Sequence, residues 1–219
     1  MLDHREAFSD RKLRLFAVAC CRQVGRGFDP LAVAAVDAAE NYADGLAPWE
    51  SVASAVLEVN AEFEACSWCF AGMDCGLAAA SPGARDAAEQ TARSAKSVPH
   101  PNGFRNLIEG GGMTDEILEL YHRACDERDV AQMAIQTDLL HDIFGNPFRP
   151  VTADPAWFTP TAVAIATAVY ADRAFDRLPI LADSLEEAGC TNADLLLHCR
   201  QPGSHVRGCW AVDLVLGYL

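Results

Sequence analysis

The segment HCRQPGSHVRGCW, residues 198–210, gathers side chains that can bind a metal or take part in catalysis. If Ser204 caps a helix, His205 and Cys209 lie four residues apart and share one face of that helix. The preceding helix and loop would supply the remaining ligands from Cys190, His198 or Cys199. Together these imidazole and thiolate groups would suffice for a tetrahedral zinc site.

The same segment also fits a different interpretation, the packed end of a helical domain. Structural zinc motifs usually combine two closely spaced ligand pairs, whereas this segment offers one loose set. His198 and Cys199 are adjacent and point about 100° apart on a helix, so both could ligate only if the helix ends there. In the packing interpretation Cys209 is buried between helices, His205 satisfies a helix end and Arg207 pairs with a carboxylate. His205 and Arg207 are then the candidate interaction residues.

A second candidate cluster is the pair Cys66-x2-Cys69, with Cys75 six residues further on. Cys66 and Cys69 share a face of an unbroken helix while Cys75 lies opposite, so ligation by all three needs a break at Gly72. A fourth ligand would have to come from elsewhere, such as His100. Because aromatic residues surround the pair, the cluster fits either a zinc or iron site or a part of the core.

Two carboxylate–histidine pairs, Glu119-x2-His122 and Asp138-x2-His141, have the ligand spacing of carboxylate-bridged di-iron bundles. On one continuous helix the two pairs would lie ~28 Å apart, whereas cooperating metal ions lie ~4 Å apart. We therefore interpret this stretch as a solvated acidic helix face.

The composition and charge of the chain argue against several classes of function. The chain has 219 residues, of which 51% are hydrophobic and 22% charged, so it can bury a core without disulfides. Its 17 basic and 31 acidic residues give a net charge of −14, which disfavours nucleic acids and acidic membrane surfaces. Its apolar stretches are shorter than the ~20 residues of a transmembrane helix, and its amino terminus lacks a signal-peptide pattern. With nine cysteines, an odd count, we expect a cytoplasmic protein without a disulfide framework.

Apolar residues recur at helical spacing along most of the chain, and no run of alternating β-branched residues predicts a strand. Helices are predicted over roughly 10–25, 30–45, 48–72, 83–97 and 114–144, and over four shorter stretches that begin near residues 160, 178, 191 and 204. Gly72 and Gly76 are predicted to break the third helix, and the Pro- and Gly-rich stretch 98–113 is predicted to be a loop. Thr191 and Asp194 have the spacing of a capping box.

These elements predict an all-α protein, either a multi-helix bundle or HEAT-like stacked helical hairpins. A Pro-rich connector over residues 147–158 cannot continue the preceding helix. It divides the chain into a helical N-terminal subdomain, residues 1–146, and a small helical C-terminal subdomain, residues 159–219.

Several blocks of the sequence are distinctive, namely SDRKLRLFAVACCR, LLHDIFGNPFRPV and LPILADSLEEAGC with HVRGCWAVDLVLG. With these blocks the chain resembles an uncharacterised bacterial family that is abundant in planctomycetes. The stretch LPILADSLEEAG is also similar to a repeat-companion segment of large multidomain proteins in the same bacteria. The family has no assigned activity, so the resemblance implies a cytoplasmic helical protein and carries over no catalytic residue.

Two hypotheses from different classes follow. The first is a non-enzymatic helical module whose acidic surface binds a protein partner and which needs no cofactor. It rests on the apolar helix faces, the short connections and the lack of a phosphate loop, a GxSxG elbow or an HExxH motif. The second is a zinc- or iron-binding protein, or a metal-dependent enzyme, that uses one of the Cys/His clusters. The sequence specifies no substrate, catalytic residue or oligomeric state.

Overall fold

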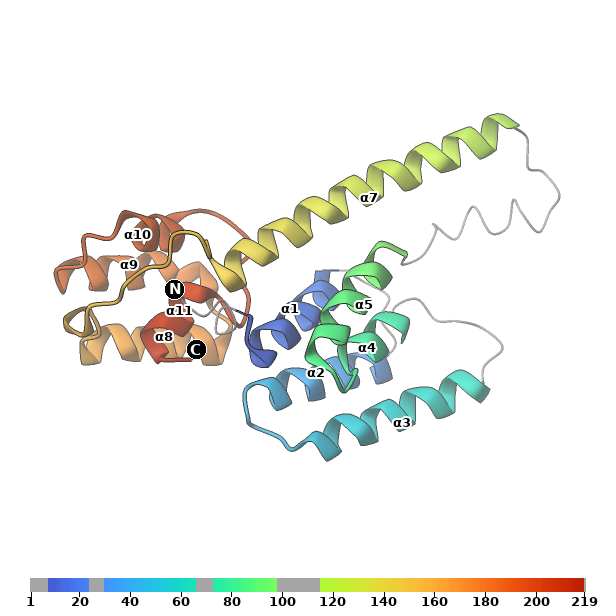
Figure 1. The fold of residues 1–219 in the computed structure, drawn as a ribbon, viewed down its shortest axis with the longest axis horizontal. Helices are drawn as coiled ribbons and strands as arrows, with labels where there is room; N and C mark the ends of the chain where they lie inside the picture. Colours follow the sequence, from blue (N-terminus) through green and yellow to red (C-terminus); the bar gives the residue numbers. More distant parts are fainter. Residues whose placement is uncertain (1–7, 24–29, 66–72, 98–114, 219) are drawn as a thin grey trace.

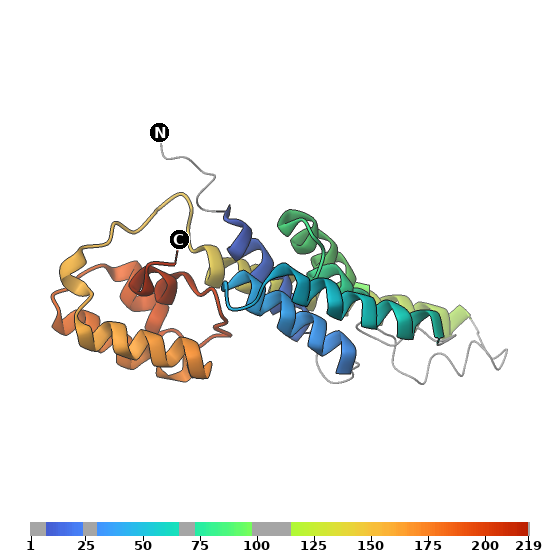
Figure 2. The ribbon, with the colours of Figure 1, turned by 90° about the horizontal axis from the view of Figure 1, so that it is seen from below.

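The computed structural model describes residues 8–23, 30–65, 73–97 and 115–218. Within these ranges all regular secondary structure is helical, which confirms the predicted all-α fold class. No helix in the described part of the chain combines the length and the apolar character needed to cross a bilayer. The helices form two groups, one at each end of the molecule (Figures 1 and 2).

The N-terminal group is drawn in blue to yellow in Figure 1. It contains α1 (Asp10–Gln23), α2 (Pro30–Ala43), α3 (Trp49–Ala65), α4 (Met73–Ala79), α5 (Ala84–Ser97) and the long α7 (Asp115–Phe144). Helix α1 is central, because every residue from Arg14 to Cys21 is buried against its neighbours. Its buried Arg14 donates hydrogen bonds of 2.8–3.2 Å to carbonyl groups at and after the end of α4. These hydrogen bonds satisfy carbonyl groups at the end of α4 without water. Cys20 and Cys21 are among these buried residues.

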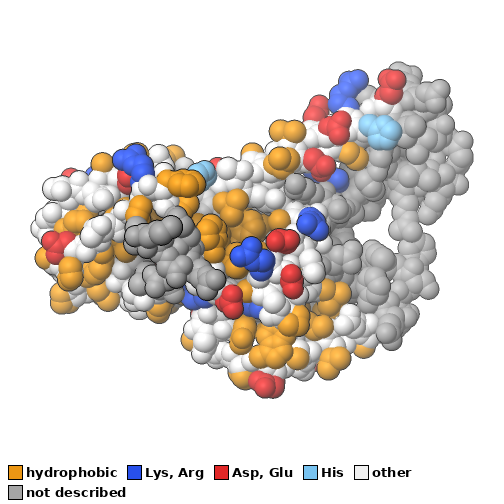
Figure 3. All heavy atoms as spheres, viewed as in Figure 1, with side chains coloured by type: hydrophobic (Ala, Val, Ile, Leu, Met, Phe, Trp, Pro, Cys, Tyr) orange, Lys and Arg blue, Asp and Glu red, His pale blue; other side chains and the backbone are white. Residues whose placement is uncertain are grey.

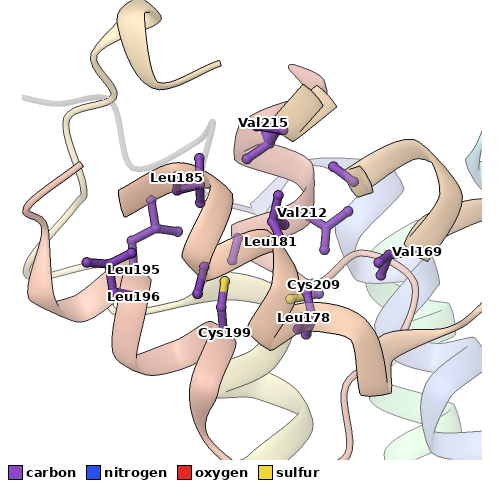
Figure 4. Packing of buried hydrophobic residues seen from close by; sticks show 14 of the residues in the cluster. Val169, Leu178, Leu181, Leu185, Leu195, Leu196, Cys199, Cys209, Val212 and Val215 are labelled. Atoms are coloured by element: carbon purple, nitrogen blue, oxygen red, sulfur yellow. The ribbon is translucent and has the colours of Figure 1, made fainter. Parts of the chain in front are cut away.

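The C-terminal group is drawn in orange to red in Figure 1. It contains α8 (Pro160–Asp172), α9 (Leu178–Glu187), α10 (Ala193–Arg200) and α11 (Trp210–Leu216), with short 3-10 turns at Pro155–Trp157 and Phe175–Arg177. These helices enclose a hydrophobic core of their own, to which α9 contributes Leu178, Leu181 and Leu185 (Figure 4). Residues 147–158, the predicted connector, lie between α7 and α8.

The carboxyl-terminal half of α7 joins the two groups. Leu139 and Ile143 of this half are fully buried in the N-terminal core with residues of α1, α2, α4 and α5. The same end of the helix also contacts α11 of the C-terminal group. The other half of α7 extends away from the remaining helices in Figure 1.

The last helix begins at Trp210, so the prediction of a helix from Ser204 is wrong. Residues 201–209, hereafter the ligand loop, contain turns and bends. Two features keep the loop out of a helix. The backbone N–H of Val206 donates to Asp142 Oδ2 at 2.9 Å, and Gly208 has a φ of +89°, which a right-handed helix excludes.

The prediction that Gly76 breaks a helix is also wrong, since Gly76 lies inside α4. A Cβ atom at this position would lie 3.1 Å from the carbonyl oxygen of Ala32 in α2. The glycine is therefore explained by the close approach of α4 to α2, which outweighs its helix penalty of about 1 kcal/mol.

Helix α10 is capped by Asn192 and not by the predicted Thr191–Asp194 pair. The side chain of Asn192 accepts a hydrogen bond from the N–H of Leu195 at 2.9 Å, while Thr191 is exposed. We expect Asn192→Ala to lower the free energy of unfolding by about 1 kcal/mol, as loss of an N-cap does. Thr191→Ala is the matched control and is expected to have almost no effect in urea denaturation. Equal losses for the two variants would contradict the capping by Asn192.

Candidate metal centre

Four potential metal ligands meet where α7, α10 and the ligand loop come together. They are Asp142, His198, His205 and Cys209, and their ligand atoms all lie within 4.8 Å of one another. Asp142 belongs to the last turn of α7 and His198 to the last turn of α10. The ligand loop, which directly follows α10, supplies the other two, so the end of α7 and one continuous stretch near the C-terminus build the cluster.

Four of the six pairs of ligand atoms lie 2.6–4.0 Å apart, a range that spans the separation around a tetrahedral zinc ion. Asp142 Oδ1 lies 2.6 Å from His205 Nδ1 and 3.2 Å from His198 Nε2. Cys209 Sγ lies 3.2 Å from His198 Nε2 and 4.0 Å from His205 Nδ1. A tetrahedral zinc ion with bonds of about 2.0–2.3 Å separates its ligand atoms by about 3.3–3.8 Å. Three of these pairs are within a few tenths of an ångström of that separation, and the Asp142–His205 pair would have to open by about 0.7 Å.

Groups outside the cluster hold the ligands in place. Asp142 presents Oδ1 to the histidines because its Oδ2 accepts the hydrogen bond from the Val206 N–H. His205 directs Nδ1 at the cluster, and its Nε2 lies 3.4 Å from the carbonyl oxygen of Gln201. The ring of His198 lies against Trp210, with ring centres 5.0 Å apart. The contact between His205 and Gln201 resembles that of metal-binding histidines, which commonly donate their second N–H to a carbonyl.

Burial and charge shape the electrostatics of the cluster. Asp142 is 4% exposed and Cys209 is fully buried. Burial by itself raises the pKa of Asp142, but hydrogen bonds from His198 and His205 outweigh it and hold that pKa below its usual range. Burial lowers the pKa of His205, but the Asp142 carboxylate more than compensates and raises it. Without a metal, these shifts favour an ion pair between Asp142 and His205.

Cys209 is poorly suited to act as a nucleophile. Its sulfur lies at hydrogen-bond distance from His198, the arrangement of a thiol and its general base. However, burial, and then the charge of Asp142, raise the pKa of the Cys209 thiol well above its usual value, which keeps it neutral. A bound metal cation would supply the positive charge that a thiolate needs here. The geometry therefore favours metal ligation over nucleophilic catalysis.

The cluster includes three of the residues that the sequence suggested and leaves others out. Cys190 and Cys199 lie in the C-terminal core instead. Figure 4 shows Cys199 there, and burial raises the pKa of its thiol to about 12. Cys66 and Cys69 lie outside the described residues, as does the side chain of Cys75.

Arg207, a candidate interaction residue, points its guanidinium at one carboxylate in α2 and one directly after it. Its NH1 lies 3.5 Å from Asp44 Oδ2 and 3.7 Å from Glu40 Oε2. His205, the other candidate interaction residue, has a side chain that is only 10% exposed and faces the cluster.

Sequence reasoning missed Asp142. It considered the neighbouring Asp138 and His141, which lie with Glu119 and His122 on one unbroken helix, as expected. The available signal was the position of Asp142 on the apolar stripe of α7, between the buried Leu139 and Ile143. An acidic residue on a buried helix face requires a partner.

No protein-family model matches the chain, and no curated protein or solved structure shows significant similarity to it. The resemblance to a planctomycete family therefore stays a prediction. The interpretation of the cluster rests on its own geometry and chemistry.

Proposed function

We propose that this protein binds a structural zinc ion through Asp142, His198, His205 and Cys209. The observation that carries the proposal is the convergence of four ligand atoms, from two separate parts of the chain, within 4.8 Å of one another. Two imidazole nitrogens, one sulfur and one carboxylate oxygen form a ligand set that zinc accepts.

The ligand types favour zinc over other common cations. Calcium and magnesium take oxygen ligands in sets of six or more, and the cluster offers one carboxylate. Nitrogen and sulfur ligands in a tetrahedral arrangement are typical of zinc. Iron, the other metal that the sequence suggested, is an outcome that metal analysis distinguishes.

A structural role follows from the number of ligands. Catalytic zinc sites have three protein ligands and leave a fourth position for water or substrate, whereas structural sites have four. Four protein groups converge here, and two of them, Asp142 and Cys209, are almost completely buried. The metal would therefore stabilise the fold without needing to meet a substrate.

A structural metal is compatible with the hypothesis of a helical module that binds a protein partner. That hypothesis stays a prediction, because the described residues reveal no partner. On the face of the molecule that Figure 3 shows, acidic side chains are interspersed with basic ones. A partner on that face would have to match a mixed pattern of charge.

The experiment is to reconstitute the purified protein with zinc, remove loosely bound metal and measure zinc by elemental analysis. We expect about one zinc ion per chain. Cys209→Ala and His198→Ala should each lower zinc affinity by more than about 100-fold, beyond the 10–100-fold loss typical of outer-sphere partners. Cys190→Ala, which removes a buried thiol of the same core outside the cluster, is the matched control and should retain the metal. Wild-type protein that takes up no metal, or equal retention by all variants, would rule the site out.

A further inference from the structure

The four proposed ligands come from both helical groups. Asp142 is flanked on α7 by Leu139 and Ile143, which belong to the N-terminal core. His198 is flanked on α10 by Cys199, which belongs to the C-terminal core, and Cys209 is part of that core itself. A metal bound to all four would therefore link the two groups directly.

The ligand loop lies between the two groups. Val206, next to His205, packs against the N-terminal core. A Cβ atom on Gly208 would lie 3.0 Å from Leu15 Cδ1 of α1, so the loop backbone is in close contact with that helix. The position of the loop therefore depends on the docking of the two groups.

Arg207 extends from the same loop into a set of ionic contacts between the groups. Besides its contacts with Glu40 of α2 and with Asp44 directly after α2, its guanidinium carbon lies 5.2 Å from the ring centre of Tyr170 in α8. Its Nε is buried without a hydrogen-bond partner among the described residues. Arg207 thus contacts the N-terminal group from a position two residues from both His205 and Cys209.

Other polar contacts connect the same surfaces. Arg173, at the end of α8, donates two hydrogen bonds to the buried Glu40 carboxylate. The hydroxyl of Tyr170 donates to Asp44 at 2.6 Å. We call these cross-group contacts, together with those of Arg207, the docking network. The contacts between the groups therefore include charged pairs that can be removed singly, without opening either hydrophobic core.

We propose that zinc binding is coupled to the docking of the C-terminal group on the N-terminal group, with Arg207 as the positioning residue that connects the two events. This inference rests on the proposed zinc site. Undocking would withdraw Asp142 from the other three ligands, and loss of Arg207 would remove contacts that favour the docked arrangement. Because linkage is reciprocal, docking strengthens zinc binding by the same factor by which zinc strengthens docking, so weakening the docking network should weaken zinc binding by up to that factor.

The test measures zinc affinity by competition with a chromophoric chelator. Arg207→Met keeps the length of the side chain and removes its charge, and it should weaken zinc binding about 5-fold or more. Arg173→Met, which disturbs the docking network without touching the ligand loop, should weaken it in the same direction. Arg200→Met is the matched control, because Arg200 on α10 pairs only with Asp183 and Glu186 of its own group among the described residues. Its zinc affinity should equal that of the wild type.

A second arm separates coupling from a local effect on the site. Asp142→Ala leaves three ligands, all on the C-terminal side, and should bind zinc more weakly. In this background Arg207→Met should cause no further loss, because the metal no longer links the two groups. The same fold-loss in both backgrounds, or unchanged affinity in Arg207→Met and Arg173→Met alone, would overturn the coupling while leaving the zinc site intact. Wild-type protein without zinc affinity would overturn the proposed function itself.

Discussion

Zinc at about 1,000 times its dissociation constant is expected to raise the free energy of unfolding by about 4 kcal/mol. Unfolding separates Asp142 from His205, which follows it by 63 residues, and so destroys the proposed site. A ligand that binds the native state alone stabilises that state by mass action. Guanidinium denaturation in excess chelator and in excess zinc would measure the difference.

Two variants test whether the stabilisation by zinc depends on the four proposed ligands. Cys209→Ala lacks a ligand and should show little or no response to zinc in the same assay. Cys190→Ala retains all four ligands and should respond like the wild type, although its baseline stability is lower because of the small cavity that it creates. Identical stability of wild-type protein in chelator and in zinc would argue against a structural metal.

Arg11→Met is expected to lower the free energy of unfolding by about 3–5 kcal/mol, as the loss of one partner from a buried ion pair does. Arg11 donates to Asp213 Oδ2 at 2.7 Å and to the hydroxyl of Tyr170 at 2.6 Å. Asp213 is 1% exposed, so its carboxylate would stay buried without its main partner. Arg200→Met, an arginine that also pairs with two carboxylates but at the surface, is the control and should change stability little.

The loss in Arg11→Met should depend on pH. Burial raises the pKa of Asp213 above its usual 3.8, and Arg11 opposes this rise, so the pKa increases further in the variant. The folded state then binds a proton at a pH where the unfolded chain has released it, and stability falls as the pH rises through this window. The deficit relative to wild type should therefore be largest near pH 7 and should shrink as the pH approaches 4. A deficit that is the same at both values would contradict the role assigned to Asp213.

The helices could be predicted from the sequence because they depend on local patterns. The predicted stretches 83–97 and 114–144 closely match α5 and α7. The errors occur where a tertiary contact overrides the local sequence pattern. A glycine stands inside α4 at position 76 because α4 approaches α2 closely there. The segment after Ser204 is not helical because Asp142 binds its backbone.

The candidate site could be predicted only in part. The 100° offset between adjacent helical residues correctly implied that His198 and Cys199 serve different surroundings, and the structure places His198 in the cluster and Cys199 in the core. Periodicity identifies the buried face of a helix but not which element covers it. The pairing of Asp142 with His205 and that of Arg11 with Asp213, 202 residues apart, therefore required the structure.

Zinc K-edge X-ray absorption on the reconstituted protein tests the proposed coordination most directly. We predict four ligands, with one sulfur at about 2.3 Å and three nitrogen or oxygen atoms at about 2.0–2.2 Å. The sulfur contribution should disappear in Cys209→Ala and persist in Cys190→Ala. Zinc surrounded only by oxygen and nitrogen in the wild type, or a sulfur ligand that survives in Cys209→Ala, would contradict the assignment.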